Sequence, residues 1–382
     1  MKSTKLALIV VLLVAAIAVV LLVAKRFSST PQPSVQIGWI GPLTGDAAPY
    51  GVAIKRGTDL AIREVNANRS FPEPLRILYE DDQAKPALGV AAFQKLVQVN
   101  RVPVVIQAAA SSVMLAVMPE AERAHIVYIS PSCSSDKIRA EKVRNNYQFT
   151  FRTWPSDAYQ AEVLAKVAAK DLNAKKAAIL YINTDYGISF KDVFAKRFED
   201  VGGSVVLCEG FAESTADFRS LLTKTRDTSP DVVFIPSHYR EAAQLLKQAK
   251  ELGLNVQFLG DAALYSPELL KAAGNAAEGL VLTNPNWSAQ SDRPQVQTFV
   301  AQFRKAYNQD PDVYAAAGYD LIFVLSAAMR DAKDLTAESI QTRLHQMTPY
   351  TGVTGELAFD SIGEVRWGFA VFRVSQGAFL PY

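Results

Sequence analysis

The stretch PVVIQAAASSVMLAVMPEAERAHIVYISPSCSSDK, residues 103–137, decides the fold of this chain. It contains two short apolar runs, at residues 104–106 and 126–129, with a helix-compatible segment between them. A strand that is apolar on both faces is typical of a parallel sheet, because helices cover both sides of such a sheet. The stretch therefore predicts a strand, a helix and a second parallel strand in a doubly wound α/β sheet.

Small and polar residues follow both runs, at the ends of the predicted strands. They are AAASS at residues 108–112 and SPSCSS at residues 130–135. Doubly wound sheets bind ligands beyond the carboxyl ends of their strands. Hydroxyls and N–H groups at a helix start favour an anion there, so the two turns predict a ligand cleft. The alternative is that these serines only cap helices.

The composition fits a two-domain globular protein and gives no sign of a polyanion binder. The chain has 382 residues, which is enough for two domains. With 40 basic and 38 acidic residues, its formal net charge is only +2. The two cysteines and three histidines are scattered and lack metal-ligand spacing. The sequence therefore indicates neither a disulfide nor a metal site.

An apolar segment without charged side chains occupies residues 6–24. As a helix it would be ~28 Å long, close to the thickness of a bilayer core. Basic residues flank it on both sides, and its last residues, LVA, make a poor cleavage site for a signal peptide. We expect residues 1–26 to form a signal or anchor helix, with an uncleaved transmembrane anchor favoured, and residues 27–34 to form a linker.

Strand-like and helix-like segments alternate through two similar units, at about residues 36–153 and 155–283. This order predicts largely parallel sheets with right-handed crossovers. Two strongly helical segments follow, at residues 295–307 and 313–331, and the tail from residue 352 alternates like strands. The order of segments thus predicts that the chain returns to its first unit before a β-rich tail.

An ordered set of segments carries a family pattern over nearly the whole chain after residue 35. In order they are IGWIGPLTGDAAPYGVAIKRGTDLAIREVNA, YEDDQAKPALGVAAFQKLV, INTDYGISF, FRSLLTKTRDTSPDVVFIPSHYREAAQLLKQAKELGL, AAEGLVLTNP and the tail TGELAFDSIGEV…FRVSQG. Together they resemble the periplasmic substrate-binding proteins of leucine/isoleucine/valine-type ABC transporters. The resemblance implies a type I periplasmic-binding fold, in which a small molecule is trapped when two lobes close.

The resemblance also implies how the chain is divided and what it works with. Crossing strands are expected near residues 149–153, 279–285 and 350–354. The lobes would then comprise residues 35–153 with 285–350, and residues 154–284 with 351–382. The expected partners are a small-molecule ligand, an ABC-transporter permease and, through the N-terminal helix, the membrane. The expected location is periplasmic or otherwise extracytoplasmic, with no role for nucleic acid.

The family's ligand contacts carry over to particular positions of this sequence. The resemblance places them at Tyr50, Ser111, Ser112, Ser132, Cys133, Ser134 and Tyr186. In amino-acid binders the hydroxyls and N–H groups hold the ligand carboxylate, and charge-assisted hydrogen bonds of this kind are strong. On the residues alone, Tyr50 could equally be a packed loop aromatic and Cys133 a small buried residue.

Two positions depart from the family pattern. His238 stands where a second tyrosine is usual, and the acidic partner of the ligand ammonium would fall at Ala262, one residue after Asp261. A buried ammonium without a partner is costly. Either Asp261 reaches the ligand, or the ligand is a carboxylic acid without an amino group, such as an aromatic or short aliphatic acid.

Two other function classes are weaker alternatives. A sensory module of the same fold would need a partner receptor, because only five residues precede the apolar segment. An enzyme would need a nucleophile or an acid/base pair at credible spacing, and the sequence offers none. The expectation is thus a binding protein that is not an enzyme, with no catalytic residues, no metal and no cofactor.

Overall fold

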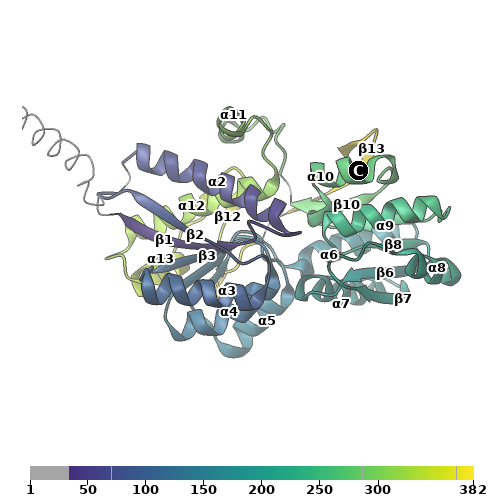
Figure 1. The fold of residues 1–382 in the computed structure, drawn as a ribbon, viewed down its shortest axis with the longest axis horizontal. Helices are drawn as coiled ribbons and strands as arrows, with labels where there is room; N and C mark the ends of the chain where they lie inside the picture. The colour runs from purple at the N-terminus through teal and green to yellow at the C-terminus, as the bar shows by residue number, and fades with distance from the viewer. Residues whose placement is uncertain (1–33, 70, 286, 367) are drawn as a thin grey trace, which may run out of the picture.

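Two α/β lobes lie side by side in the computed structural model, each built around its own sheet (Figure 1). The structure describes residues 34–69, 71–285, 287–366 and 368–382. The predicted N-terminal helix at residues 1–26 and nearly all of the predicted linker lie outside these residues. Within them, the prediction of an α/β fold with two doubly wound lobes is confirmed.

The first lobe contains a five-stranded sheet whose neighbouring strands all run parallel. In spatial order the strands are β2 (Leu75–Asp81), β1 (Val35–Gly41), β3 (Val104–Gln107), β4 (Val127–Ser130) and β5 (Thr150–Arg152). The two apolar runs of residues 103–137 supply β3 and β4, and every residue of both strands is buried. Helices cover both faces of this sheet, as buried parallel strands require.

The helices of the first lobe divide between the two faces of its sheet. One face packs against α2 (Ala48–Ala67), α11 (Pro294–Tyr307), α12 (Val313–Asp331) and α13 (Ala337–His345). The other packs against α3 (Pro86–Gln94) with its π-helical extension (Lys95–Val99), α4 (Ser111–Arg123) and α5 (Asp136–Asn145). The chain therefore does return, since α11 to α13 complete the core begun by α2.

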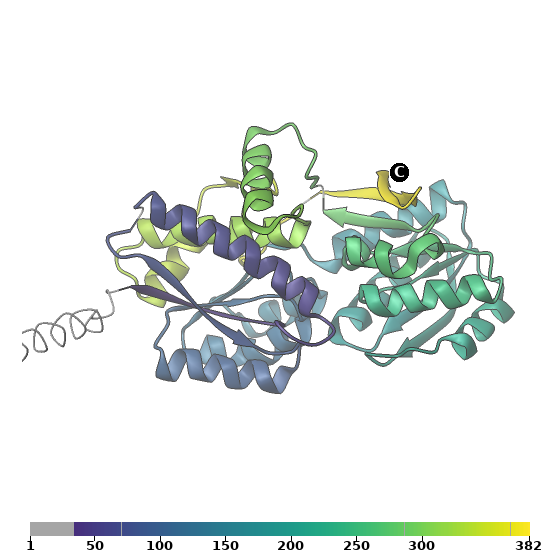
Figure 2. The same ribbon diagram turned by 45° about the horizontal axis from the view of Figure 1, so that its top comes forward.

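The second lobe contains a seven-stranded, mixed sheet. Its strands, in spatial order, are β14 (Ala378–Pro381), β13 (Phe369–Ser375), β10 (Val281–Pro285), β9 (Gln257–Gly260), β8 (Val232–Phe234), β6 (Lys176–Ile182) and β7 (Ser204–Phe211). The tail strand β13 pairs antiparallel with β10 and with β14, whereas the other pairs are parallel. Figure 2 shows the tail strands beside β10 in this lobe.

Helices also cover both faces of the second sheet. They are α6 (Asp157–Lys166) with its π-helical extension (Val167–Asp171) and α7 (Asp185–Asp200) on one face, and α8 (Arg219–Thr228), α9 (Tyr239–Glu251) and α10 (Pro267–Ala273) on the other. Short 3₁₀ turns at Ala262–Leu264 and Gly274–Ala276 flank α10.

The third crossing between the lobes lies later in the chain than predicted. Residues 350–354 do not cross, because β11 (Tyr350–Thr351) pairs with β12 (Glu356–Leu357) and Val353 and Val365 are in the core of the first lobe. The chain enters the second sheet only at Phe369. We therefore propose a lobe boundary after Val365 in place of residue 350. The remaining lobe bounds stay predictions.

Two helices have no clear signal in the sequence pattern. Helix α5 is strongly polar, and α10 has only seven residues, so neither shows a clear apolar periodicity. At the first expected crossing, near residues 149–153, the strand comprises Thr150–Arg152, which pairs with β4.

Within the described ranges, only helix α12 is long and apolar enough to cross a membrane. However, 83% of that window is buried inside the protein. Its apolar surface thus packs against α2 and the sheet, as in a core helix.

Helices α2 and α12 approach each other closely through glycines. A Cβ atom at Gly57 would lie 1.9 Å from the carbonyl oxygen of Ala315, and one at Gly318 would lie 2.5 Å from that of Ile54. Backbone carbonyls cannot yield as flexible side chains do, so this helix pair requires glycine at both positions.

We expect Gly57→Ala to lower the free energy of unfolding by about 1–3 kcal/mol, measured by urea denaturation. The methyl group forces α2 away from α12, and the gain in helix propensity, about 1 kcal/mol at most, does not compensate. Gly368→Ala is the control, because a Cβ there meets no atom within 4 Å. Equal stability of the two variants would contradict the close contact.

Candidate functional site

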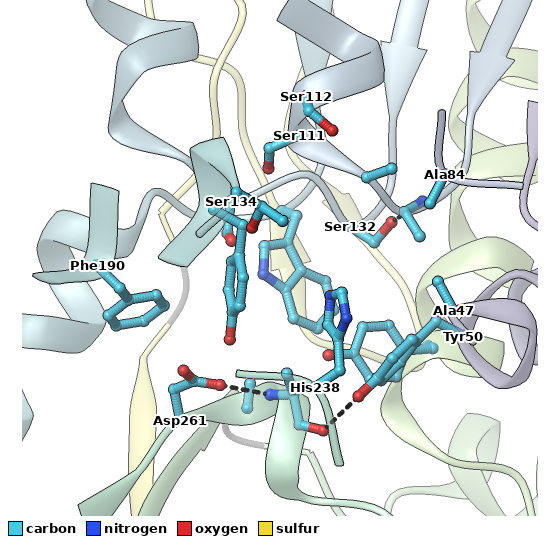
Figure 3. A pocket seen from close by; sticks show the side chains of 18 of the residues that line it. Ala47, Tyr50, Ala84, Ser111, Ser112, Ser132, Ser134, Phe190, His238 and Asp261 are labelled. Carbon is cyan, nitrogen blue, oxygen red and sulfur yellow. Dashed lines mark hydrogen bonds between the residues drawn. The ribbon is translucent and has the colours of Figure 1, made fainter. Parts of the chain in front are cut away.

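A pocket lies between the two lobes, beyond the carboxyl ends of both sets of parallel strands (Figure 3). Its empty space is about 710 Å³, a figure that includes the solvent at its open mouth. The residues that line it are Ala47, Tyr50, Ala84, Ala109, Ala110, Ser111, Ser112, Ser132, Ser134, Trp154, Gln160, Thr184, Tyr186, Phe190, Glu213, His238, Asp261, Ala262, Ala263 and Tyr314. Eight of the nine predicted ligand contacts are among them.

The wall from the first lobe is built for an anion. Helix α4 begins at Ser111, and its first two residues, Ser111 and Ser112, line the pocket with backbone N–H groups that have no acceptor within the helix. Ala109 and Ala110 reach this point in a left-handed conformation, with φ of 55° and 56°. These small side chains leave the helix start accessible, and the helix dipole adds partial positive charge there.

Two serine hydroxyls on this wall, those of Ser132 and Ser111, are placed to donate a hydrogen bond into the pocket. Ser132 Oγ accepts a hydrogen bond from the backbone N–H of Ala109 at 2.8 Å. Ser111 Oγ accepts one from the N–H of Ser135 at 3.3 Å. Since each oxygen already accepts a hydrogen bond from the protein, its own O–H remains available for an acceptor in the pocket.

The wall from the second lobe carries a buried acid, Asp261. Its side chain follows β9 and is fully buried. Its Oδ1 accepts a hydrogen bond from the N–H of Ala263 at 2.8 Å, whereas Oδ2 has no hydrogen-bond partner. Burial is the main cause that raises the pKa of Asp261 to about 7. Figure 3 shows Asp261 across the pocket from Ser111 and Ser134.

The hydroxyl of Tyr186 is a second buried polar group on this wall that has no hydrogen-bond partner. Burial, followed by the nearby charge of Asp261, raises the pKa of Tyr186 well above its usual value. The hydroxyl therefore stays protonated and lies close to Asp261 without a hydrogen bond of ordinary geometry. A ligand donor or acceptor entering here would meet both groups.

Several aromatic rings also line the pocket. Tyr50 lies 5.2 Å from Tyr314 and 5.6 Å from His238, measured between ring centroids. Tyr314 in turn stacks on Trp154 at 5.2 Å, and the ring of Tyr186 is nearly parallel to that of His238. Burial lowers the pKa of His238, so the imidazole is neutral at pH 7. The pocket thus combines an apolar aromatic lining with a few polar groups.

Cys133 is the predicted contact that does not line the pocket, and that prediction is wrong for its side chain. Its Sγ points back to the carbonyl oxygen of Ala109, at 3.0 Å. Burial raises the pKa of this thiol to about 12, so it remains protonated and is no nucleophile. The cysteine is a small buried residue within the turn of residues 132–135.

Several lining residues were missed by the sequence prediction. Tyr314 lies in the first turn of α12, and Trp154 follows β5. Gln160 accepts a hydrogen bond from the N–H of Ala262 through its Oε1, at 2.9 Å. The Trp-Pro pair after β5 signals a strand end, but no local pattern brings a residue as distant as Tyr314 to the pocket.

Hydrogen bonds join the two lobes across the mouth of the pocket. The hydroxyl of Tyr50 donates to the carbonyl oxygen of Ala263 at 2.9 Å and accepts from the N–H of Tyr239 at 3.1 Å. Asp46, also from the first lobe, accepts from Ser214 Oγ at 2.5 Å and forms an ion pair with Arg240. The lobes are therefore in a closed arrangement.

The described part of the chain contains no group of three or more His, Cys, Asp or Glu side chains that could hold a metal ion. Its polar groups instead fit an organic ligand with an anionic end at the serines and a hydrogen-bonding or cationic group at Asp261.

Comparisons with known proteins agree with this architecture. A family model described as "Periplasmic binding protein" matches residues 34–377. The chain is 28% identical over 348 residues to the leucine-, isoleucine-, valine-, threonine- and alanine-binding protein of Pseudomonas aeruginosa, covering 90% of this chain and 91% of that protein.

Solved structures show the same fold. A leucine-binding protein from Thermotoga maritima has a TM-score of 0.84 and 25% identity, covering 91% of this chain and 97% of that one. An ABC-transporter solute-binding protein from R. palustris, solved in complex with benzoate, has a TM-score of 0.82 and 23% identity, covering 91% and 95%.

We expect Tyr50→Phe to shift the ligand-free protein towards an open arrangement. The variant keeps the ring but loses both hydrogen bonds of the hydroxyl, each worth about 1 kcal/mol, so the ratio of closed to open molecules falls about tenfold or more. Small-angle X-ray scattering should give a larger radius of gyration. Tyr307→Phe is the matched control, since its hydroxyl bonds to Arg56 and Arg63 within the first lobe. An unchanged radius in Tyr50→Phe would contradict this assignment.

Proposed function

Since this chain belongs to the periplasmic binding protein family, we propose that it binds an amino acid or a close relative in the pocket between its lobes and delivers it to an ABC-transporter permease. The relative from Pseudomonas aeruginosa is named for binding leucine, isoleucine, valine, threonine and alanine. That name supports an amino acid with an uncharged side chain as the ligand. The protein would act outside the cytoplasm, held at the membrane by residues 6–24 or released after cleavage.

The observation that carries this proposal is the free carboxylate oxygen of Asp261. An α-ammonium group would supply the donor that this buried oxygen lacks, and Tyr186 would contribute its hydroxyl oxygen. The ligand carboxylate would lie at the opposite wall, against Ser111, Ser134 and the first turn of α4. Asp261 would thus replace the acid that the family pattern puts one residue later. A zwitterion can pair its ammonium group with Asp261 and its carboxylate with the serine wall at the same time.

The aromatic lining favours a second candidate, a carboxylic acid with an aromatic ring. Six rings line the pocket, those of Tyr50, Trp154, Tyr186, Phe190, His238 and Tyr314. Aromatic walls suit a planar ligand through stacked and edge-to-face contacts. A protonated Asp261 or the neutral imidazole of His238 would then pair with a polar substituent on the ring.

Isothermal titration against the 20 L-amino acids and a set of aromatic and aliphatic acids tests the proposal. We expect 1:1 binding of at least one of them with a Kd in the micromolar range or below, about 8 kcal/mol or more of binding free energy. Ser111→Ala combined with Ser134→Ala should weaken that binding at least 100-fold, because two hydrogen bonds to a charged group are lost. Ser220→Ala, an exposed serine, is the control. No binding across the panel would refute the proposal.

The pH dependence distinguishes the two candidates. With a pKa of about 7, Asp261 becomes protonated as the pH falls below 7 and then no longer attracts an ammonium. The affinity for an amino acid should therefore fall towards low pH, by up to tenfold per pH unit. Asp261→Asn should weaken amino-acid binding and abolish this dependence. An aromatic acid that pairs with protonated Asp261 would instead bind more weakly as the pH rises.

A further inference from the structure

A buried arginine behind the serine wall, Arg152, takes no part in lining the pocket. It is the last residue of β5, and its side chain is 0% exposed. A buried guanidinium is costly unless its donors are satisfied. Here the hydrogen bonds go to two places, the serine turn of residues 132–135 and the segment that leads into the third crossing.

The first set of bonds holds the backbone of the serine turn. Arg152 Nη1 donates to the carbonyl oxygen of Cys133 at 3.2 Å and to that of Ser135 at 2.9 Å. The carbonyl oxygen between them, that of Ser134, accepts from the N–H of Asp157 at 2.8 Å. Three consecutive carbonyl groups are thus fixed from behind, while the side chain of Ser134 lines the pocket.

The second set of bonds fixes the guanidinium itself. Arg152 Nε and Nη2 both donate to Glu364 Oε1, at 3.0 and 2.7 Å, and Glu364 is 4% exposed. The backbone N–H of Arg152 also donates to the carbonyl oxygen of Gly363 at 3.0 Å. Residues 363 and 364 lie just before the crossing that enters β13 at Phe369.

Arg152 thus connects the serine turn to both neighbouring crossings. β5 leads directly into the first crossing, and Glu364 precedes the third. Because the planar fork of arginine makes four side-chain bonds in fixed directions, a lysine could not satisfy both sets. The arrangement keeps the anion-binding wall in a constant position relative to the points where the lobes are joined.

On the basis of the proposed function, we propose that Arg152 is a positioning residue for the anionic group of the ligand, which acts through Ser134 and is itself oriented by Glu364. It does not touch the ligand. It holds the serine turn so that the Ser134 hydroxyl meets the anion when the lobes close.

The test is a double-mutant cycle between Arg152→Lys and Ser134→Ala, measured by isothermal titration. The probe is whichever of L-leucine, L-isoleucine, L-alanine or benzoate binds the unmutated protein most tightly. We expect Arg152→Lys to weaken binding at least tenfold in the native background and less than twofold when Ser134 is already alanine. A merely structural role would give losses that multiply, and such losses would overturn the proposal.

Arg139→Lys is the matched control. Arg139 bonds to the same Glu364, at 3.3 Å, and to Asp360 at 3.1 Å, but it makes no hydrogen bond to the serine turn. We expect its affinity to stay within twofold of the native value. An equal loss in Arg139→Lys and Arg152→Lys would mean a general disturbance of the buried charges, and would also overturn the proposal.

Two further measurements keep the test decisive. If Arg152→Lys does not fold, as judged by circular dichroism, Glu364→Gln replaces it, and its smaller loss must likewise disappear in the Ser134→Ala background. If the native protein binds none of the four probes, amide hydrogen exchange at residues 132–135 is compared. Exchange at least tenfold faster in Arg152→Lys than in Arg139→Lys supports the positioning role even where the proposed ligand class is wrong, and equal rates refute it.

Discussion

The parallel strands of two sheets can contact one ligand only if their carboxyl ends face each other, and the rest of this structure depends on that constraint. Every parallel strand ends in a loop at the same edge, so the polar residues of each lobe gather there without any local signal that pairs them. The crossings after β5, after β10 and before β13 bring the two edges together. Helices α11 to α13 then close the first core, so the chain cannot complete either lobe without passing through the other.

The two walls of the pocket differ in electrostatic character: one offers hydrogen-bond donors and the other a carboxylate. Its first-lobe wall offers O–H and N–H donors at the start of α4, and its second-lobe wall offers the carboxylate of Asp261. Between them lie rings and a neutral His238, which contribute no net charge. A low-polarity interior strengthens each remaining electrostatic contact and penalises each unpaired group. We therefore propose that the carboxylate oxygen of Asp261 that lacks a hydrogen bond is the feature by which the site discriminates among carboxylates.

Residues that join the two lobes lie next to residues that line the pocket in the sequence. Tyr50 spans the lobes through its hydroxyl while its ring lines the pocket, and Asp46 lies four residues earlier with its own contacts to the second lobe. Arg152 and Glu364 form a rigid base on the opposite side of the serine turn. A ligand held between these elements makes contacts available only in the closed arrangement, which is how binding shifts the population of closed molecules.

The sequence by itself determined the strand and helix order, the two-lobed α/β fold and the turns that would carry the ligand contacts. Those features are local, because burial on both faces of a strand and the small residues after it can be read within a few positions. It also placed Asp261 one residue before the position that the family pattern gives to the acidic partner of the ligand ammonium, which left open whether Asp261 reaches the ligand. Tertiary structure decided the rest: which way Cys133 points, that Asp261 faces the pocket, that Tyr314 and Trp154 join its wall, and that Val365 still packs in the core of the first lobe. Such outcomes depend on side-chain direction and on pairing between distant segments, and neither leaves a periodic trace in the sequence.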